Sequence, residues 1–178
     1  DATRWAIKEA NVDPRRICIA GASYGGYAAM MGLVREPDLY QCAINWVGVT
    51  DPALMYSLPY SDIREESKQY SLPIRLGDPK KDPEMFRRIS PVAQAARITK
   101  PVLMAYGSSD HRVPMEHGKQ LRDALAPHNK NVEWVVYSNE GHGWGSPETL
   151  HDFWGRVEKF LDRNLNGGAT AASTAAAR

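Results

Sequence analysis

The chain has 178 residues, of which 43% are hydrophobic and 24% charged, as expected for one globular domain with an apolar core. Its formal net charge of +1 gives no electrostatic reason to expect a nucleic acid or an anionic membrane as a partner. No apolar run approaches the roughly 18 residues that a membrane span requires. The chain opens DATRWAIKEA, without an initiating Met or a signal peptide. We therefore expect a piece of a longer protein, cytoplasmic or, if an upstream signal has been lost, periplasmic or secreted.

The two cysteines, Cys18 and Cys42, are too few for a disulfide framework and lack the spacing of a metal site. Each lies in an apolar run, so we expect both to be small buried residues within strands.

Apolar runs alternate with helical periodicity along the chain. Residues 3–11 favour a helix with Trp5, Ala6 and Ala10 on one side. An apolar strand at residues 17–20 leads through a glycine-rich turn into a helix at residues 24–35. Further strands are expected at residues 42–47, 102–106 and 133–137, and further helices at residues 116–126 and 147–165.

The last helix carries the clearest boundary signal. Ser146 is a suitable N-cap, and Pro147 suits the first helical position. Its buried stripe is expected to consist of Leu150, Phe153, Trp154, Val157, Phe160 and Leu161.

This order of elements indicates an α/β fold, in which a parallel sheet is covered by helices on both faces. Residues 51–88 break the alternation, being rich in Pro, Tyr and charged residues, and are interpreted as an insertion over the strand ends. The low-complexity segment at residues 166–178 is expected to be a disordered tail.

The segment Gly21-Ala22-Ser23-Tyr24-Gly25 has the pattern G-x-S-x-G. Because a predicted strand precedes it and a predicted helix follows, it has the context of a nucleophile elbow, in which a strained turn exposes a serine hydroxyl. Side chains at positions 21 and 25 would be expected to collide with neighbouring backbone. The backbone N–H of Tyr24, at the start of the helix, is a candidate oxyanion donor.

A serine nucleophile requires a base to take its proton and an acid to orient that base. In this fold the order along the chain is serine, acid, histidine, each in a loop after a strand. Asp110 and His142 meet both conditions, and Asp51, which also follows a strand, is the alternative acid.

The other histidines are less suitable as the base. His111 adjoins the predicted acid and His128 lies in a polar turn, whereas His117 and His151 fall in predicted helices and are expected at the surface.

Three segments, GASYGGYAAM, SPVAQAARITKPVLMAYGSSDHRVP and NEGHGW, occur in this order and resemble the catalytic domain of the prolyl oligopeptidase family of serine peptidases. Dipeptidyl aminopeptidases and acylaminoacyl-peptidase-like proteins are the most similar branch. The resemblance covers about residues 1–165 and implies an α/β-hydrolase catalytic domain. By motif position, the family's catalytic residues fall on Ser23, Asp110 and His142.

The resemblance also implies a mainly apolar pocket beside the nucleophile. Tyr24, Val113 and, more weakly, Val49 occupy positions that resemble pocket-lining ones, although packing in the core would also explain them. No metal or organic cofactor is implied.

Compared with the family pattern, this sequence lacks several expected segments. Nothing resembles the β-propeller that family members carry, and the four predicted strands correspond to the C-terminal half of the hydrolase sheet. The absent half includes the loop that supplies a second oxyanion donor. It also includes the neighbour of the strand at residues 17–20, so we expect the chain to associate with itself as a homo-oligomer or with a missing fragment.

The sequence therefore predicts a serine peptidase that hydrolyses short peptides or acyl-amino-acid substrates through an acyl-enzyme. A carboxylesterase on the same fold and a truncated, non-catalytic chain are the alternatives.

Overall fold

The computed structural model describes residues 1–59 and 61–166 of the chain. Its centre is a four-stranded, wholly parallel sheet in which the strands lie in chain order. The strands are β1 (Cys18–Ala22), β2 (Cys42–Trp46), β3 (Val102–Gly107) and β4 (Val132–Tyr137). All four strands predicted from the sequence are thus confirmed, with ends that differ by one or two residues.

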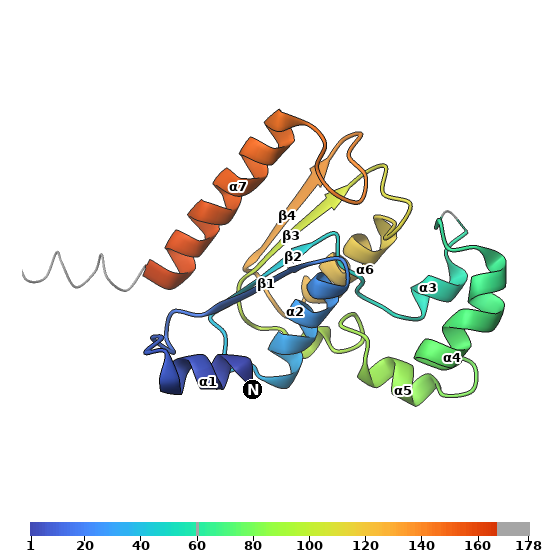
Figure 1. Cartoon of the computed structure of the whole chain (residues 1–178), viewed down its shortest axis with the longest axis horizontal. Helices are drawn as coiled ribbons and strands as arrows, with labels where there is room; N and C mark the ends of the chain where they lie inside the picture. Colours follow the sequence, from blue (N-terminus) through green and yellow to red (C-terminus); the bar gives the residue numbers. More distant parts are fainter. Residues whose placement is uncertain (60, 167–178) are drawn as a thin grey trace, which may run out of the picture.

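Helices cover both faces of this sheet (Figure 1). One face packs against α2 (Tyr24–Arg35) and α6 (Glu116–Leu125), and the other against α7 (Pro147–Leu161). The strand β3 is buried along its whole length, so its side chains alternate between two apolar clusters. Met104 and Tyr106 join the cluster under α2 and α6, while Leu103 and Ala105 join the cluster under α7. The predicted α/β class is correct.

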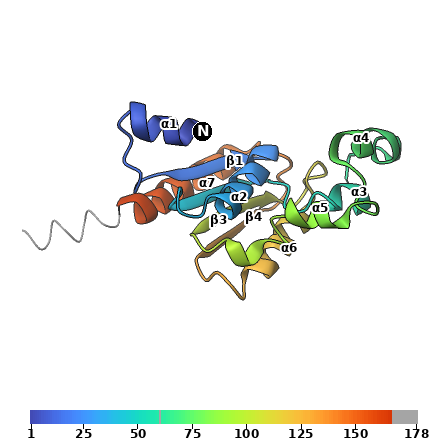
Figure 2. The same ribbon diagram turned by 90° about the horizontal axis from the view of Figure 1, so that it is seen from below.

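The segment predicted as an insertion contains short helices and a π-helical turn. They are α3 (Leu54–Ser57), the π-helical turn Ser67–Ser71, α4 (Leu72–Leu76) and α5 (Pro83–Arg88). Both views place α3, α4 and α5 together at one end of the molecule, opposite α1 (Ala2–Glu9) and the carboxyl end of α7 (Figure 1, Figure 2). A 3₁₀ turn, Ala95–Arg97, then leads towards β3.

The insertion is attached to the loop that follows β3. The Asp62 backbone N–H donates to the carbonyl oxygen of His111 at 2.7 Å, and the Arg112 guanidinium donates to the Asp62 carboxylate at 2.6 Å. The insertion therefore contacts the loop that carries the predicted acid.

The first helix is less buried than its pattern suggested. It has no buried residue, and Trp5, predicted on its apolar side, is 63% exposed. The contacts of this helix with the rest of the molecule are partly polar, since Thr3 hydrogen-bonds Tyr40 and Arg4 forms an ion pair with Glu36, both just after α2.

The last helix confirms the predicted cap and corrects the predicted stripe. The Ser146 hydroxyl accepts a hydrogen bond from the backbone N–H of Thr149, and Pro147 occupies the first turn. Phe153, Val157 and Phe160 are buried as expected, but Leu150 and Trp154 are 36% and 52% exposed. The predicted stripe was too wide, because only one narrow face of α7 meets the sheet. Residues 162–166 continue as a π-helical turn.

The cysteine prediction was right in placing both residues in strands, but it missed their pairing. Cys18 and Cys42 stand opposite each other in the β1–β2 ladder, with their Cα atoms 4.7 Å apart, and form a disulfide. This Cα separation is within the range that a disulfide bridges, and the parallel register brings the two residues together although 24 positions separate them in the sequence.

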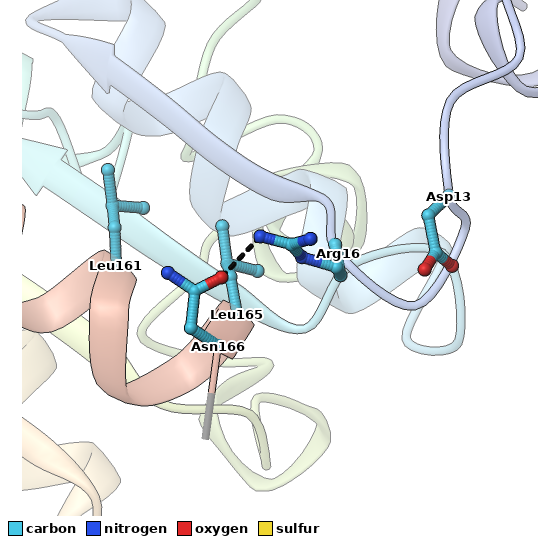
Figure 3. Close-up of a pocket in the computed structure, with 5 residues that line it drawn as sticks. All are labelled: Asp13, Arg16, Leu161, Leu165 and Asn166. Carbon is cyan, nitrogen blue, oxygen red and sulfur yellow. Dashed lines mark hydrogen bonds between the residues drawn. The ribbon is translucent and has the colours of Figure 1, made fainter. Parts of the chain in front are cut away.

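A surface hollow lies near the amino end of β1, away from the nucleophile. Asp13, Arg16, Leu161, Leu165 and Asn166 line it, and Arg16 donates a hydrogen bond to Asn166 (Figure 3). The predicted disordered tail begins at this Asn166, and its remaining residues, 167–178, lie outside the described residues. Among the described residues, no helix is long and apolar enough to cross a membrane.

Candidate active site

Ser23 lies in the turn between β1 and α2 with φ of 57° and ψ of −120°. A non-glycine residue rarely adopts positive φ, and such strain is typical of a nucleophile elbow. The Ser23 backbone N–H donates to the carbonyl oxygen of Trp46 at 2.9 Å, which ties the turn to the end of β2. Strand pairing therefore helps to hold the strained conformation.

The two glycines of the motif differ in their surroundings. A Cβ atom at Gly21 would lie 2.2 Å from the carbonyl oxygen of Gly25, so the tight turn excludes any side chain there. A Cβ at Gly25 would meet nothing within 4 Å, which contradicts the expected collision. The next residue, Gly26, is the one that is packed tightly, since a Cβ there would lie 2.4 Å from the Asn45 side chain.

The structure brings the predicted histidine to Ser23 and the predicted acid to that histidine. His142 Nε2 lies 2.8 Å from Ser23 Oγ, and His142 Nδ1 lies 2.8 Å from Asp110 Oδ2. Ser23 follows β1, Asp110 follows β3 and His142 follows β4, so the three side chains meet at the carboxyl edge of the sheet. The imidazole side chain is 26% exposed, whereas the carboxylate side chain is fully buried.

The Asp110 carboxylate is held by its own loop. Its Oδ1 accepts hydrogen bonds from the backbone N–H groups of Arg112 and Val113, at 2.8 and 2.9 Å. These bonds leave Oδ2 directed at the imidazole. A buried carboxylate fixed in this way can hold one imidazole tautomer, with Nε2 available to accept a proton.

The rival acid lies elsewhere in the structure. Asp51 Oδ1 accepts a hydrogen bond from the backbone N–H of Ala53 within the turn after β2. The structure therefore brings Asp110, rather than Asp51, to His142.

The remaining histidines lie outside this arrangement, and one prediction about them was wrong. His111, His128 and His151 are exposed, but His117 has no exposed surface. Its Nδ1 accepts a hydrogen bond from the Thr50 backbone N–H at 3.3 Å. Burial lowers the pKa of His117 to about 4. The spacing of His117, Leu121 and Leu125, four residues apart, places all three on the buried face of α6 and was the overlooked signal.

A buried polar group lies beneath the elbow. The Tyr106 hydroxyl donates to the carbonyl oxygen of Gly48 at 2.7 Å and accepts from the Asn45 amide at 3.1 Å. Burial raises the pKa of this tyrosine, so its hydroxyl stays protonated. These bonds fix the backbone after β2, where Val47 has a φ of 44°, an uncommon conformation for a β-branched residue.

The predicted pocket residues are not gathered into one hollow. The Tyr24 side chain is 74% exposed and lines a surface hollow between α2 and β1, with Tyr27, Met31 and Tyr40 among its neighbours. Val113 is 2% exposed and belongs to the core, and Val49 packs against that core. A role for these residues in substrate binding stays a prediction.

Tyr24 is also the first residue of α2. Its backbone N–H belongs to the first turn, where N–H groups have no partner within the helix. Among residues 1–59 and 61–166, no group of three or more His, Cys, Asp or Glu side chains could hold a metal ion.

A parallel sheet with this serine elbow, and with an acid and a histidine at the same edge, defines an α/β-hydrolase fold, of which four strands are described here. The model of the prolyl oligopeptidase family matches residues 1–168, and the chain belongs to this family.

Two relatives within this family are similar to the chain over most of its length. The chain is 33% identical over 174 residues to dipeptidyl aminopeptidase BIII of Pseudoxanthomonas mexicana, covering 95% of this chain and 24% of that protein. It is 27% identical over 172 residues to the acylamino-acid-releasing enzyme of Arabidopsis thaliana, covering 91% of this chain and 22% of that protein.

One solved structure is also similar to the chain over most of its length. The acylaminoacyl peptidase of Pyrococcus horikoshii superposes with a TM-score of 0.80 at 25% identity, over 92% of this chain and 26% of that one. The chain thus spans about a quarter of the length of these relatives.

Proposed function

We propose that this chain is the catalytic part of a serine peptidase that cleaves short peptides or acyl-amino-acid substrates. The observation that carries the proposal is the continuous pair of hydrogen bonds, each 2.8 Å, from Ser23 through His142 to Asp110. Membership of a family of peptidases supports the same class of reaction.

In the proposed reaction, Ser23 Oγ attacks the carbonyl carbon of the scissile bond while His142 Nε2 takes the hydroxyl proton. Asp110 accepts a hydrogen bond from Nδ1–H and stabilises the imidazolium that forms. The imidazolium then gives its proton to the leaving amine, which departs and leaves an acyl-enzyme on Ser23. Water attacks the acyl carbon while the same imidazole takes its proton. The imidazolium then returns a proton to Ser23 Oγ as the bond to the acyl carbon breaks, which releases the acid product and the free serine.

The developing oxyanion is proposed to accept a hydrogen bond from the Tyr24 backbone N–H. Its place at the first turn of α2 supports this role, because the partial positive charge of a helix N-terminus favours an anion. Loss of one oxyanion donor in other enzymes costs about 2.7–4 kcal/mol of transition-state stabilisation, so the number of donors governs the rate.

The substrate class follows from the relatives. One is named a dipeptidyl aminopeptidase and another an acylamino-acid-releasing enzyme, and both names describe the removal of small units from the end of a peptide. We therefore propose short peptides with a free or acylated amino terminus as the substrates.

Labelling with a fluorophosphonate probe tests the nucleophile. Mass spectrometry is expected to place the adduct on Ser23. The Ser23→Ala variant should lose labelling, whereas Ser109→Ala, the matched control in the exposed part of the acid loop, should keep it. An adduct on any other serine would overturn the assignment.

Turnover then separates peptidase from esterase. Aminoacyl-anilides and short acyl esters are compared with the same protein, and Ser23-dependent cleavage of anilides is expected. Cleavage of esters alone would assign a carboxylesterase, and absence of both with an unlabelled Ser23 would assign a non-catalytic chain.

A further inference from the structure

Glu140 is a buried acidic residue that has no part in the proposed reaction. It precedes His142 by two positions and is 7% exposed. Its Oε2 accepts a hydrogen bond from the Gly145 backbone N–H at 2.7 Å, and its Oε1 accepts one from the Ser146 backbone N–H at 3.1 Å. The side chain therefore spans the loop that carries the histidine and joins its two ends.

The backbone of the same residue contacts the loop that carries the acid. The Glu140 carbonyl oxygen accepts a hydrogen bond from the Ser109 N–H at 2.9 Å, one residue before Asp110. The two loops are closely packed here, since a Cβ atom at Gly107 would lie 2.3 Å from that carbonyl oxygen. Glu140 thus links the acid loop to the histidine loop through its carbonyl.

We propose that Glu140 is a positioning residue for His142, which closes the loop of residues 140–146 with its carboxylate and fixes that loop to the Asp110 loop with its carbonyl. This inference rests on the proposed function, because it assumes that the placement of His142 between Ser23 and Asp110 determines the rate.

The negative charge of the Glu140 carboxylate is suited to accepting these two backbone hydrogen bonds. The backbone N–H groups of Gly145 and Ser146 lower the pKa of the Glu140 carboxyl, which keeps it ionised. An ionised carboxylate accepts at both oxygens, whereas a glutamine amide accepts at one and would turn its own N–H₂ towards the second N–H donor. Glu140→Gln therefore keeps the size of the side chain but opens one end of the loop.

The test measures kcat and KM of Glu140→Gln at a temperature where the variant is fully folded. We expect kcat to fall by about 10-fold to 100-fold, the effect of a small misplacement of a catalytic group, with KM within about twofold of wild type. The proton resonance of His142 Nδ1–H, hydrogen-bonded to Asp110, is expected to broaden or disappear from the downfield NMR spectrum.

Three controls separate positioning from loss of stability or charge. Glu158→Gln removes a charge from an exposed position of α7, and Glu116→Gln removes one from the first turn of α6. Leu125→Ala destabilises the cluster under α6, to which none of the described residues 140–146 belongs. All three are expected to keep wild-type kcat in the folded protein and to keep the Nδ1 resonance.

Two outcomes would overturn the inference: kcat of Glu140→Gln within twofold of wild type, or an Nδ1 resonance unchanged from wild type. The NMR measurement needs no turnover. If wild type shows no Ser23-dependent activity, the proposed function fails, and the resonance still decides whether Glu140 positions His142.

Discussion

Cys18 and Cys42 join β1 to β2 by a disulfide, at a pair of residues that face each other in the strand register. The strand β1 leads directly to Ser23, so the crosslink lies in the element that presents the proposed nucleophile.

Reduction of this disulfide is expected to lower the free energy of unfolding by about 3 kcal/mol, since the crosslink closes a loop of moderate length in the unfolded chain. Urea unfolding with and without dithiothreitol measures the difference. The double variant Cys18→Ser, Cys42→Ser should show no response to the reductant. Identical unfolding curves for oxidised and reduced wild type would refute the prediction.

Asp110→Asn is expected to lower kcat by about 10⁴, the magnitude known for the same change in another triad, because the amide favours the wrong imidazole tautomer. Asp51→Asn is the matched control, since Asp51 bonds only within its own turn in the hydrogen bonds described above. Steady-state kinetics on an aminoacyl-anilide measures both. A large loss in Asp51→Asn with little loss in Asp110→Asn would move the acid to Asp51.

His117 should make the fold sensitive to acid. Its pKa is lowered to about 4 in the folded protein, against about 6.5 when unfolded, so the unfolded chain binds the proton more tightly. The free energy of unfolding should therefore fall as the pH drops from about 6.5 to about 4, by about 3 kcal/mol from this group.

The measurement for His117 is chemical denaturation across that pH range. His117→Asn removes the titrating group and should flatten the curve relative to wild type, whereas His128→Asn, at an exposed position, should not. Equal pH dependence in wild type and His117→Asn would contradict the assignment.

The outer edge of β1 is expected to make the 178-residue chain associate with itself. Within the described residues β1 pairs with β2 alone, and its other edge presents unpaired backbone groups. Sedimentation should show a dimer or a larger species, and Ala20→Lys, which puts a charge on the exposed edge strand, should give a folded monomer. Ala126→Lys, after α6, is the control. A wild-type chain that stays monomeric as its concentration rises would disprove this.

The sequence was most informative where local geometry demands particular residues. Ser23 could be predicted because Gly21 and the flanking strand and helix belong to one continuous segment, and chain order then selected Asp110 and His142. The disulfide could not be predicted from the sequence, because a parallel ladder pairs two strands that are separated by a whole helix. The register of the two strands is not visible in the sequence of either one. Glu140 was missed because its partners, Gly145 and Ser146, offer only backbone N–H groups, which every sequence contains.

The strand order of the sheet repeats the order of strands along the chain, so each ladder forms between consecutive segments. The contact between Ser23 and His142, by contrast, spans 119 residues and can close only when β4 has joined β3. Long-range closures of this kind carry the largest entropy loss and tend to form late in folding. During refolding, the hydroxyl of Ser23 should therefore gain its reactivity in the last kinetic phase, after most of the fluorescence and circular dichroism signals have recovered. The rate at which a fluorophosphonate begins to label the refolding chain would then time the arrival of the final strand.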